Sequence, residues 1–160
     1  MSPAGDWVSL RADLDAGCNA AYFGVQGFNM RARADNFTAA SLGRIVRLCH
    51  GAGARAYLAL NTIIYEAELG KIRALLSRAQ AAGIDAVICW DFSVIEAARS
   101  LGLPVFASTQ MSVSNSSGLL ALYRRFGIKR FVLARECSLV DIKKIKRSLA
   151  GELGAQAHEI

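Results

Sequence analysis

Residues 82–90, AGIDAVICW, show the pattern that decides the fold. A glycine stands near the start, a polar residue follows, and the stretch then becomes an unbroken apolar run. The same order recurs as AGCNAAYFG at 16–24, AGARAYLAL at 52–60 and FGIKRFVLA at 126–134. Glycine ends a helix readily, and a continuous apolar run is typical of a strand covered on both faces. The recurrence therefore predicts one helix-to-strand unit that is used several times.

Five buried strands are expected from these and similar runs, at residues 20–25, 54–60, 86–90, 104–107 and 130–134. The segments between them carry apolar residues at the spacing of amphipathic helices. We expect helices at 7–16 after an Asp6 cap, from a Thr38 cap to Gly51, from Leu69 to Gly83, and at 92–101, 115–126 and 138–149. A helix between successive strands implies right-handed crossovers and a parallel sheet.

The fold class predicted from this alternation is α/β, a parallel (β/α) TIM-barrel-like domain over residues 1–160. Repeated use of one unit favours a barrel, and a flavodoxin-like open sheet is the alternative. The sequence contains about five to six β-α units, with short further fragments at residues 2–4 and 157–160. These are too few strands to close a barrel, so we expect the barrel to be incomplete.

The composition is that of a well-packed domain, with 53% hydrophobic and 20% charged residues. The apolar runs are too short to cross a bilayer and no secretory signal is visible, so we expect a cytoplasmic protein. The four cysteines, Cys18, Cys49, Cys89 and Cys137, include no pair at chelate spacing, so we expect reduced thiols and no metal site. The formal charge of +6 permits attraction to RNA, but solvated helix faces are the favoured explanation.

Polar residues gather where the expected strands pass into the following loops, which is where parallel α/β folds place their function. The candidates for substrate binding are Asn29, Arg31, Arg33, Asn61, Thr109, Gln110, Ser112, Asn115, Arg135 and Glu136. Arg31 and Arg33 would suit phosphate or carboxylate groups. Structural roles remain open for some: Asn61 as a strand end, Asn115 as a helix cap, and Arg135 with Glu136 as an ion pair.

Catalytic residues cannot be assigned from the sequence. It contains no G-x-S-x-G elbow, no H-E-x-x-H, no P-loop and no G-x-G-x-x-G after a strand. The two histidines, His50 and His158, fall at a helix end and in the terminal segment. Cys137 follows a strand and is a candidate nucleophile, but the pattern places no histidine beside it.

Several of these segments resemble one known family. They are FNMRARADNF at 28–37, LALNT at 58–62, ASTQMSVSN at 107–115 and FVLAREC at 131–137. In their order and spacing they look like the N-terminal region of the peptidase U32 family, also called collagenase-like proteases. This resemblance implies a TIM-barrel-like N-terminal domain, in agreement with the strand and helix pattern.

The resemblance also implies a function for the whole protein. The family name records a protease, and therefore a hydrolase, but several similar proteins take part in hydroxylating tRNA or ribosomal RNA, or in oxygen-independent ubiquinone synthesis. Those proteins typically hold an iron–sulfur cluster on cysteines that follow an "HG…C" region. The main expectation is an iron–sulfur-dependent RNA hydroxylation protein. A collagenase-like peptidase and a ligand-binding barrel without catalysis are the alternatives.

None of the four cysteines matches a cluster position, and His158 falls about where the family enters that region. We therefore expect the chain to be an inactive fragment without a cofactor of its own. An RNA or peptide substrate would need the remainder of the protein. Exposed strand edges are expected to favour self-association of such a fragment.

Overall fold

The computed structural model describes residues 1–30 and 37–153, which form one parallel sheet. Its strands are β1 (Ser2–Ala4), β2 (Ala20–Gly24), β3 (Arg55–Leu60), β4 (Ala86–Cys89), β5 (Val105–Ala107) and β6 (Arg130–Phe131). They lie in the order β1-β2-β3-β4-β5-β6, which is also the order of the chain. A flavodoxin-like sheet reverses its strand order at a switch point, so this order contradicts that alternative and confirms the barrel type. The sheet is open, because β1 and β6 each pair on one side only.

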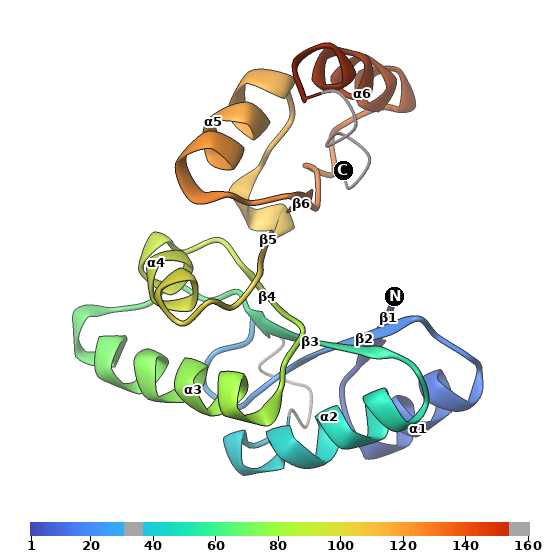
Figure 1. The fold of residues 1–160 in the computed structure, drawn as a ribbon, viewed down its shortest axis with the longest axis vertical. Coiled ribbons are helices and arrows are strands. Elements are labelled where there is room, and N and C mark those ends of the chain that lie inside the picture. Colours follow the sequence, from blue (N-terminus) through green and yellow to red (C-terminus); the bar gives the residue numbers. More distant parts are fainter. Residues whose placement is uncertain (31–36, 154–160) are drawn as a thin grey trace.

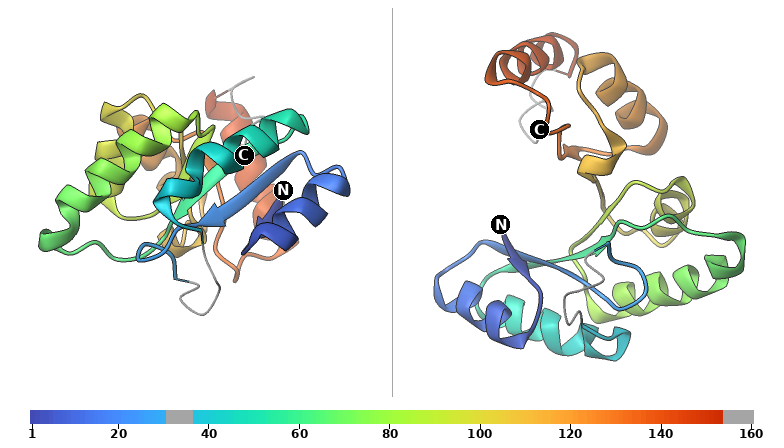
Figure 2. Two further views of the ribbon diagram at one scale, coloured as in Figure 1. Left: turned by 90° about the horizontal axis from the view of Figure 1, so that it is seen from below. Right: turned by 180° about the vertical axis from the view of Figure 1, so that it is seen from behind.

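A helix follows each strand. The helices are α1 (Trp7–Asp15), α2 (Leu42–Gly51), α3 (Leu69–Ala82), α4 (Phe92–Ser100), α5 (Ser116–Phe126) and α6 (Leu139–Leu153). Short 3₁₀ turns, η1 (Ala39–Ser41), η2 (Glu66–Glu68) and η3 (Thr109–Met111), stand in the loops. The helices succeed one another around the outside of a curved sheet (Figure 1), and this holds from below and from behind (Figure 2).

The two faces of the sheet carry different clusters of apolar residues. The larger core lies between the sheet and the helices and includes Phe23, Leu58 and Leu76. A smaller cluster on the opposite face is built around Tyr57 and Ile88, with other residues of the same strand face packed against it. Successive strand residues point to opposite faces, so this smaller cluster marks the inward face of the barrel.

The predicted helix starts are confirmed in part. Asp6 caps α1 by accepting a hydrogen bond from the Ser9 backbone N–H at 2.7 Å. The backbone and side-chain hydrogen bonds from Ser9 also lower the pKa of Asp6. Thr38 does not cap α2, which contradicts the prediction: its side chain makes no cap bond, and its hydroxyl lies 3.0 Å from that of Ser41. A 3₁₀ turn intervenes, so α2 begins at Leu42.

The last strand is shorter than the expected run at 130–134. Val132 still donates its backbone N–H to Ala107 at 2.9 Å, but Ala134 donates instead to Val113 in the preceding loop, also at 2.9 Å. β6 therefore ends at Phe131, and the chain turns away from β5 after Val132. The expected fragment at 2–4 is β1, and the one at 157–160 lies outside the described residues. No helix in the described part of the chain is long and apolar enough to cross a membrane.

Candidate functional site

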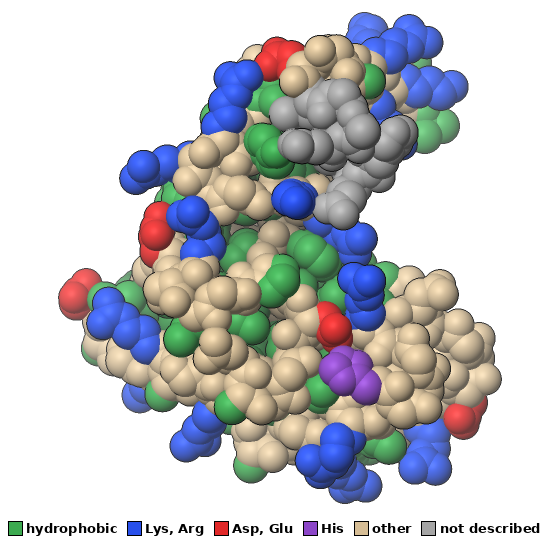
Figure 3. All heavy atoms as spheres, in the orientation of Figure 1, with side chains coloured by type: hydrophobic (Ala, Val, Ile, Leu, Met, Phe, Trp, Pro, Cys, Tyr) green, Lys and Arg blue, Asp and Glu red, His purple; other side chains and the backbone are tan. Residues whose placement is uncertain are grey.

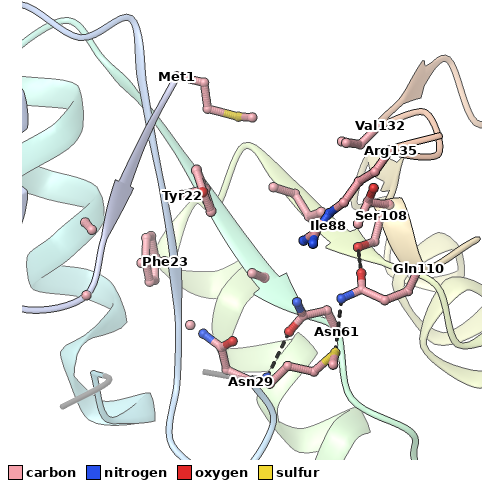
Figure 4. A pocket seen from close by; sticks show the side chains of 16 residues that line it. Met1, Tyr22, Phe23, Asn29, Asn61, Ile88, Ser108, Gln110, Val132 and Arg135 are labelled. Atoms are coloured by element: carbon pink, nitrogen blue, oxygen red, sulfur yellow. Dashed lines mark hydrogen bonds between the residues drawn. The ribbon is translucent and has the colours of Figure 1, made fainter. Parts of the chain in front are cut away.

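A cavity of about 340 Å³ lies where the strands end, on the inward face of the sheet. Its walls come from every strand or the loop that follows it, from Ala4 at the end of β1 to Arg135 beyond β6. Figure 4 shows its side chains converging from both ends of the sheet. Half of the ten residues proposed from the sequence line it, namely Asn29, Asn61, Thr109, Gln110 and Arg135.

Asn61 is the first residue after β3 and is half-buried. Its side-chain oxygen accepts the backbone N–H of Met30 at 3.1 Å, and its backbone carbonyl accepts the indole N–H of Trp90, also at 3.1 Å. Asn61 therefore ties the loops after β2 and β4 to the end of β3. Among the described residues its Nδ2 has no hydrogen-bond partner, so it can donate to a ligand.

Two hydrogen bonds of different strength hold the side chain of Gln110, which lies in η3. Its Oε1 accepts a hydrogen bond from the Ser108 hydroxyl, and its Nε2 donates to the sulfur of Met30 at 3.0 Å. A thioether is a weak acceptor, so a ligand oxygen can replace the sulfur at little cost. The neighbouring Thr109 donates its hydroxyl to the carbonyl of Leu133 at 3.1 Å, which joins η3 to the loop after β6.

Gly24 is required at the end of β2 because Asn29 lies directly over it. A Cβ built on Gly24 would fall 1.5 Å from Nδ2 and 2.6 Å from Cβ of Asn29, far inside van der Waals contact. The missing side chain lets the loop fold back onto its own strand. Sequence and packing together thus place the Asn29 amide in the wall of the cavity.

Arg135 brings positive charge to the cavity. It is exposed, and its side chain points from the loop after β6 toward Ile88 (Figure 4). The ion pair considered with Glu136 is not formed, and Arg135 has no carboxylate partner among the residues the structure describes. Tyr22, Ile88 and Val132 add apolar surface to the same cavity. The cavity therefore combines a cation that has no carboxylate partner among the described residues with apolar surface.

The other sequence candidates lie elsewhere. Asn115 caps α5, accepting the Gly118 backbone N–H at 2.8 Å. Ser112 ends η3 in a left-handed conformation, and Glu136 is exposed outside the cavity. Arg31 and Arg33 fall outside the described residues.

Three lining residues could have been identified from the strand pattern but were not proposed. Tyr22, Ile88 and Val132 all stand on the strand face opposite to the buried Phe23 and Val87. Strict alternation along each strand places them on the inward side. Nearly continuous apolar runs hide this alternation, because both faces carry apolar residues.

The cysteines of the chain do not fit an iron–sulfur cluster. Cys49 and Cys89 are buried, and Cys18 and Cys137 are half-buried. Within residues 1–30 and 37–153, no group of three or more His, Cys, Asp or Glu is arranged to hold a metal ion. We therefore assign no step of chemistry to a cluster held by these side chains.

The burial of the thiols predicts their reactivity. Burial, helped by the nearby Cys18 and Asp85, raises the pKa of Cys49 to about 11, and burial also raises the pKa of Cys89. Only the thiolate attacks a disulfide reagent, so neither should react at about pH 8. A chromogenic aryl disulfide is expected to label Cys18 and Cys137 in the folded chain, and all four after unfolding. Rapid labelling of Cys89 in the native protein, located by peptide mapping, would contradict this placement.

The family model described as peptidase family U32 matches residues 5–159. The chain is 36% identical over 163 residues to a collagenase of Porphyromonas gingivalis, covering 100% of this chain and 39% of that protein. It is 40% identical over 149 residues to an uncharacterized protease of Methanocaldococcus jannaschii, covering 93% and 36%. It is 28% identical over 160 residues to the tRNA hydroxylation protein P1 of Bacillus subtilis, covering 99% and 38%. The chain thus spans less than two-fifths of the length of each of these three relatives.

Solved structures of (β/α) barrel enzymes share the fold. The tryptophan synthase alpha chain of Legionella pneumophila subsp. pneumophila superposes with a TM-score of 0.55 at 16% identity, covering 94% of this chain and 66% of that one. The type I 3-dehydroquinate dehydratase of Clostridium difficile gives 0.56 at 12% identity, covering 94% and 63%. At such identities the likeness concerns the fold alone.

Proposed function

Because the chain belongs to peptidase family U32, we propose that it forms the substrate-recognition rim of an RNA-hydroxylating protein. The observation that carries the proposal is the set of hydrogen-bond donors around the cavity. Asn61 Nδ2, Gln110 Nε2 and the Arg135 guanidinium all line it. The tRNA hydroxylation relative supports the choice of RNA as substrate, and a cytoplasmic location follows from that substrate.

The chemistry of the rim suits a nucleotide. Amide and guanidinium donors pair with the carbonyl oxygens of a base and with phosphate, while the apolar wall of Tyr22, Ile88 and Val132 can cover a ring face. Enzymes that modify a base take it out of the stack and hold it in such a pocket. We propose that the residues here recognise the base, and that other parts of the whole protein supply the oxidation chemistry and any iron–sulfur cluster.

Gln110→Ala tests this role in the whole protein. Losing one neutral hydrogen bond to the substrate is expected to lower tRNA hydroxylation about tenfold. The measurement is mass spectrometry of nucleosides from a deletion strain that carries the variant gene. Gln26→Ala is the matched control, since Gln26 is exposed and does not line the cavity, and it should leave hydroxylation unchanged. Equal hydroxylation in both variants would refute a recognition role for Gln110.

A collagenase-like peptidase is the second candidate function. It is favoured by the collagenase and protease relatives, at 36% and 40% identity against 28% for the tRNA protein. Of the two aliphatic hydroxyls at the cavity, that of Thr109 donates to the Leu133 carbonyl, and that of Ser108, which is 4% exposed, donates to the amide oxygen of Gln110. An amide does not take up a proton as a general base does, so this pair resembles a fixed contact more than an activated nucleophile. Gelatin cleavage by the whole protein, abolished in Ser108→Ala, would favour the peptidase over the RNA-hydroxylating protein.

Binding of a substrate without either activity would instead indicate a non-catalytic ligand-binding barrel.

A further inference from the structure

A second hollow, of about 330 Å³, lies between α1 and α2 on the outer side of the sheet. Three arginines line it: Arg11 on α1, and Arg44 and Arg47 on α2. Residues three or four apart on a helix share a face, and this spacing aligns Arg44 with Arg47, and Arg11 with Trp7. Both helices therefore turn a row of side chains into the same groove, which we call the arginine groove.

Within the described ranges, the three arginines have no carboxylate partner, unlike Arg124 and Arg99. Arg124 pairs with Glu152 at 2.7 Å, and Arg99 lies 3.7 Å from Glu96. Asp15 also lines the hollow, but in the described part of the chain no carboxylate pairs with any arginine of the groove. All three are exposed, so their charge is available to a ligand. Lys and Arg side chains project along the lower edge of the molecule in Figure 3, where α1 and α2 lie.

One of these arginines is held in place by an aromatic ring. The Arg44 guanidinium carbon lies 4.3 Å from the centre of the Trp7 ring. Trp7 in turn packs edge-on against Phe37, with ring centres 5.0 Å apart. Stacking leaves the edge N–H groups of a guanidinium free, so Arg44 is presented in a fixed orientation for bidentate bonds.

The same aromatic residues connect the groove to the cavity. Phe37 donates its backbone N–H to the carbonyl of Gly24 at 3.3 Å, and Gly24 lines the cavity. The Trp7 end of the groove thus adjoins the edge of the sheet at which the cavity opens. A single strand of nucleic acid could place one base in the cavity and continue its backbone between α1 and α2.

We propose that the arginine groove binds phosphates of the RNA backbone flanking the modified base. The inference rests on the proposed function for the substrate, and on charge complementarity for the surface. Arginine forms bidentate bonds with phosphate, and each neutralised phosphate releases counterions. Binding through the groove is accordingly sequence-independent and sensitive to salt, whereas the cavity reads the base.

The test compares two triple variants of the whole protein by titration with tRNA at several salt concentrations. Arg11→Gln, Arg44→Gln and Arg47→Gln together are expected to weaken binding about tenfold at low salt and to reduce the slope of log affinity against log salt by about 2. The matched control replaces Lys71, Arg73 and Arg78 on α3 by Gln, which removes the same charge from exposed positions. It should retain the slope of the unmodified protein. A triple Arg→Lys variant of the groove should also retain it, since charge alone sets the slope.

The outcomes separate the two proposals. Loss of slope in the groove variant but not in the α3 control supports the phosphate site. Equal slopes in the two variants overturn the site and leave the recognition rim standing. Failure of the unmodified protein to bind tRNA at any salt concentration overturns both.

Discussion

Gly24→Ala in the whole protein is expected to lower tRNA hydroxylation about a hundredfold, the effect of displacing a binding group by about 1 Å. The added Cβ would lie 1.5 Å from Nδ2, 2.3 Å from Cγ and 2.6 Å from Cβ of Asn29, so the entire Asn29 side chain must move. The neighbouring Met30, whose N–H holds Asn61, would move with it. One methyl group should thus disturb two walls of the cavity.

The control for this substitution is Gly70→Ala, near the start of α3. A Cβ there meets nothing within 4 Å, and alanine favours a helix, so stability should rise by about 0.5–1 kcal/mol with activity unchanged. Hydroxylation is measured by nucleoside mass spectrometry, with thermal unfolding run in parallel to confirm that the Gly24 variant is folded. Full activity in a folded Gly24→Ala protein would mean that the position of Asn29 is irrelevant to the substrate.

Leu58→Ala is expected to lower the free energy of unfolding of the chain by about 3–5 kcal/mol. Leu58 is 0% exposed in β3, in the core between the sheet and the helices. β3 is an inner strand that pairs with β2 and β4, so the surrounding backbone has little freedom to close the space left behind. Urea unfolding followed by circular dichroism gives the difference.

Leu139→Ala makes the same chemical change where it should cost little. Leu139 begins α6 and is 76% exposed, so its loss should alter the free energy of unfolding by about 0.5 kcal/mol or less. Similar costs at both positions would show that the sheet-to-helix core does not have the arrangement described.

Most of the fold was predictable because each unit repeats a local signal. The glycine before each apolar run gave the strand starts to within a residue or two, and Asp6 marked the start of α1. The errors arose where long-range contacts decide the outcome. β6 ends early because Ala134 bonds Val113, a partner that no local pattern reveals. The 3₁₀ turn before α2 likewise separates Thr38 from the helix it was expected to cap.

The sequence predicted where the site lies, but not all of the residues that line it. The polar residues at the strand ends predicted that the site lies at the carboxyl-terminal edge of the sheet, and five of the candidates line the cavity there. Asn115 and Gln110 look alike in sequence, yet one caps α5 and the other faces the cavity. Only the backbone path after β5 distinguishes them. The sequence did not predict the arginine groove, because Arg11 and Arg44 are far apart in the chain and line one hollow only through the packing of α1 against α2.

The sheet adds its strands in the order in which they are synthesised. Each strand after β1 therefore finds a neighbour already present at the growing edge of the sheet. Pairing between strands that are neighbours in the chain keeps the entropy cost of closing each loop lower than pairing between distant strands would. The architecture suits assembly from the N-terminus onward while the ribosome is still extending the chain.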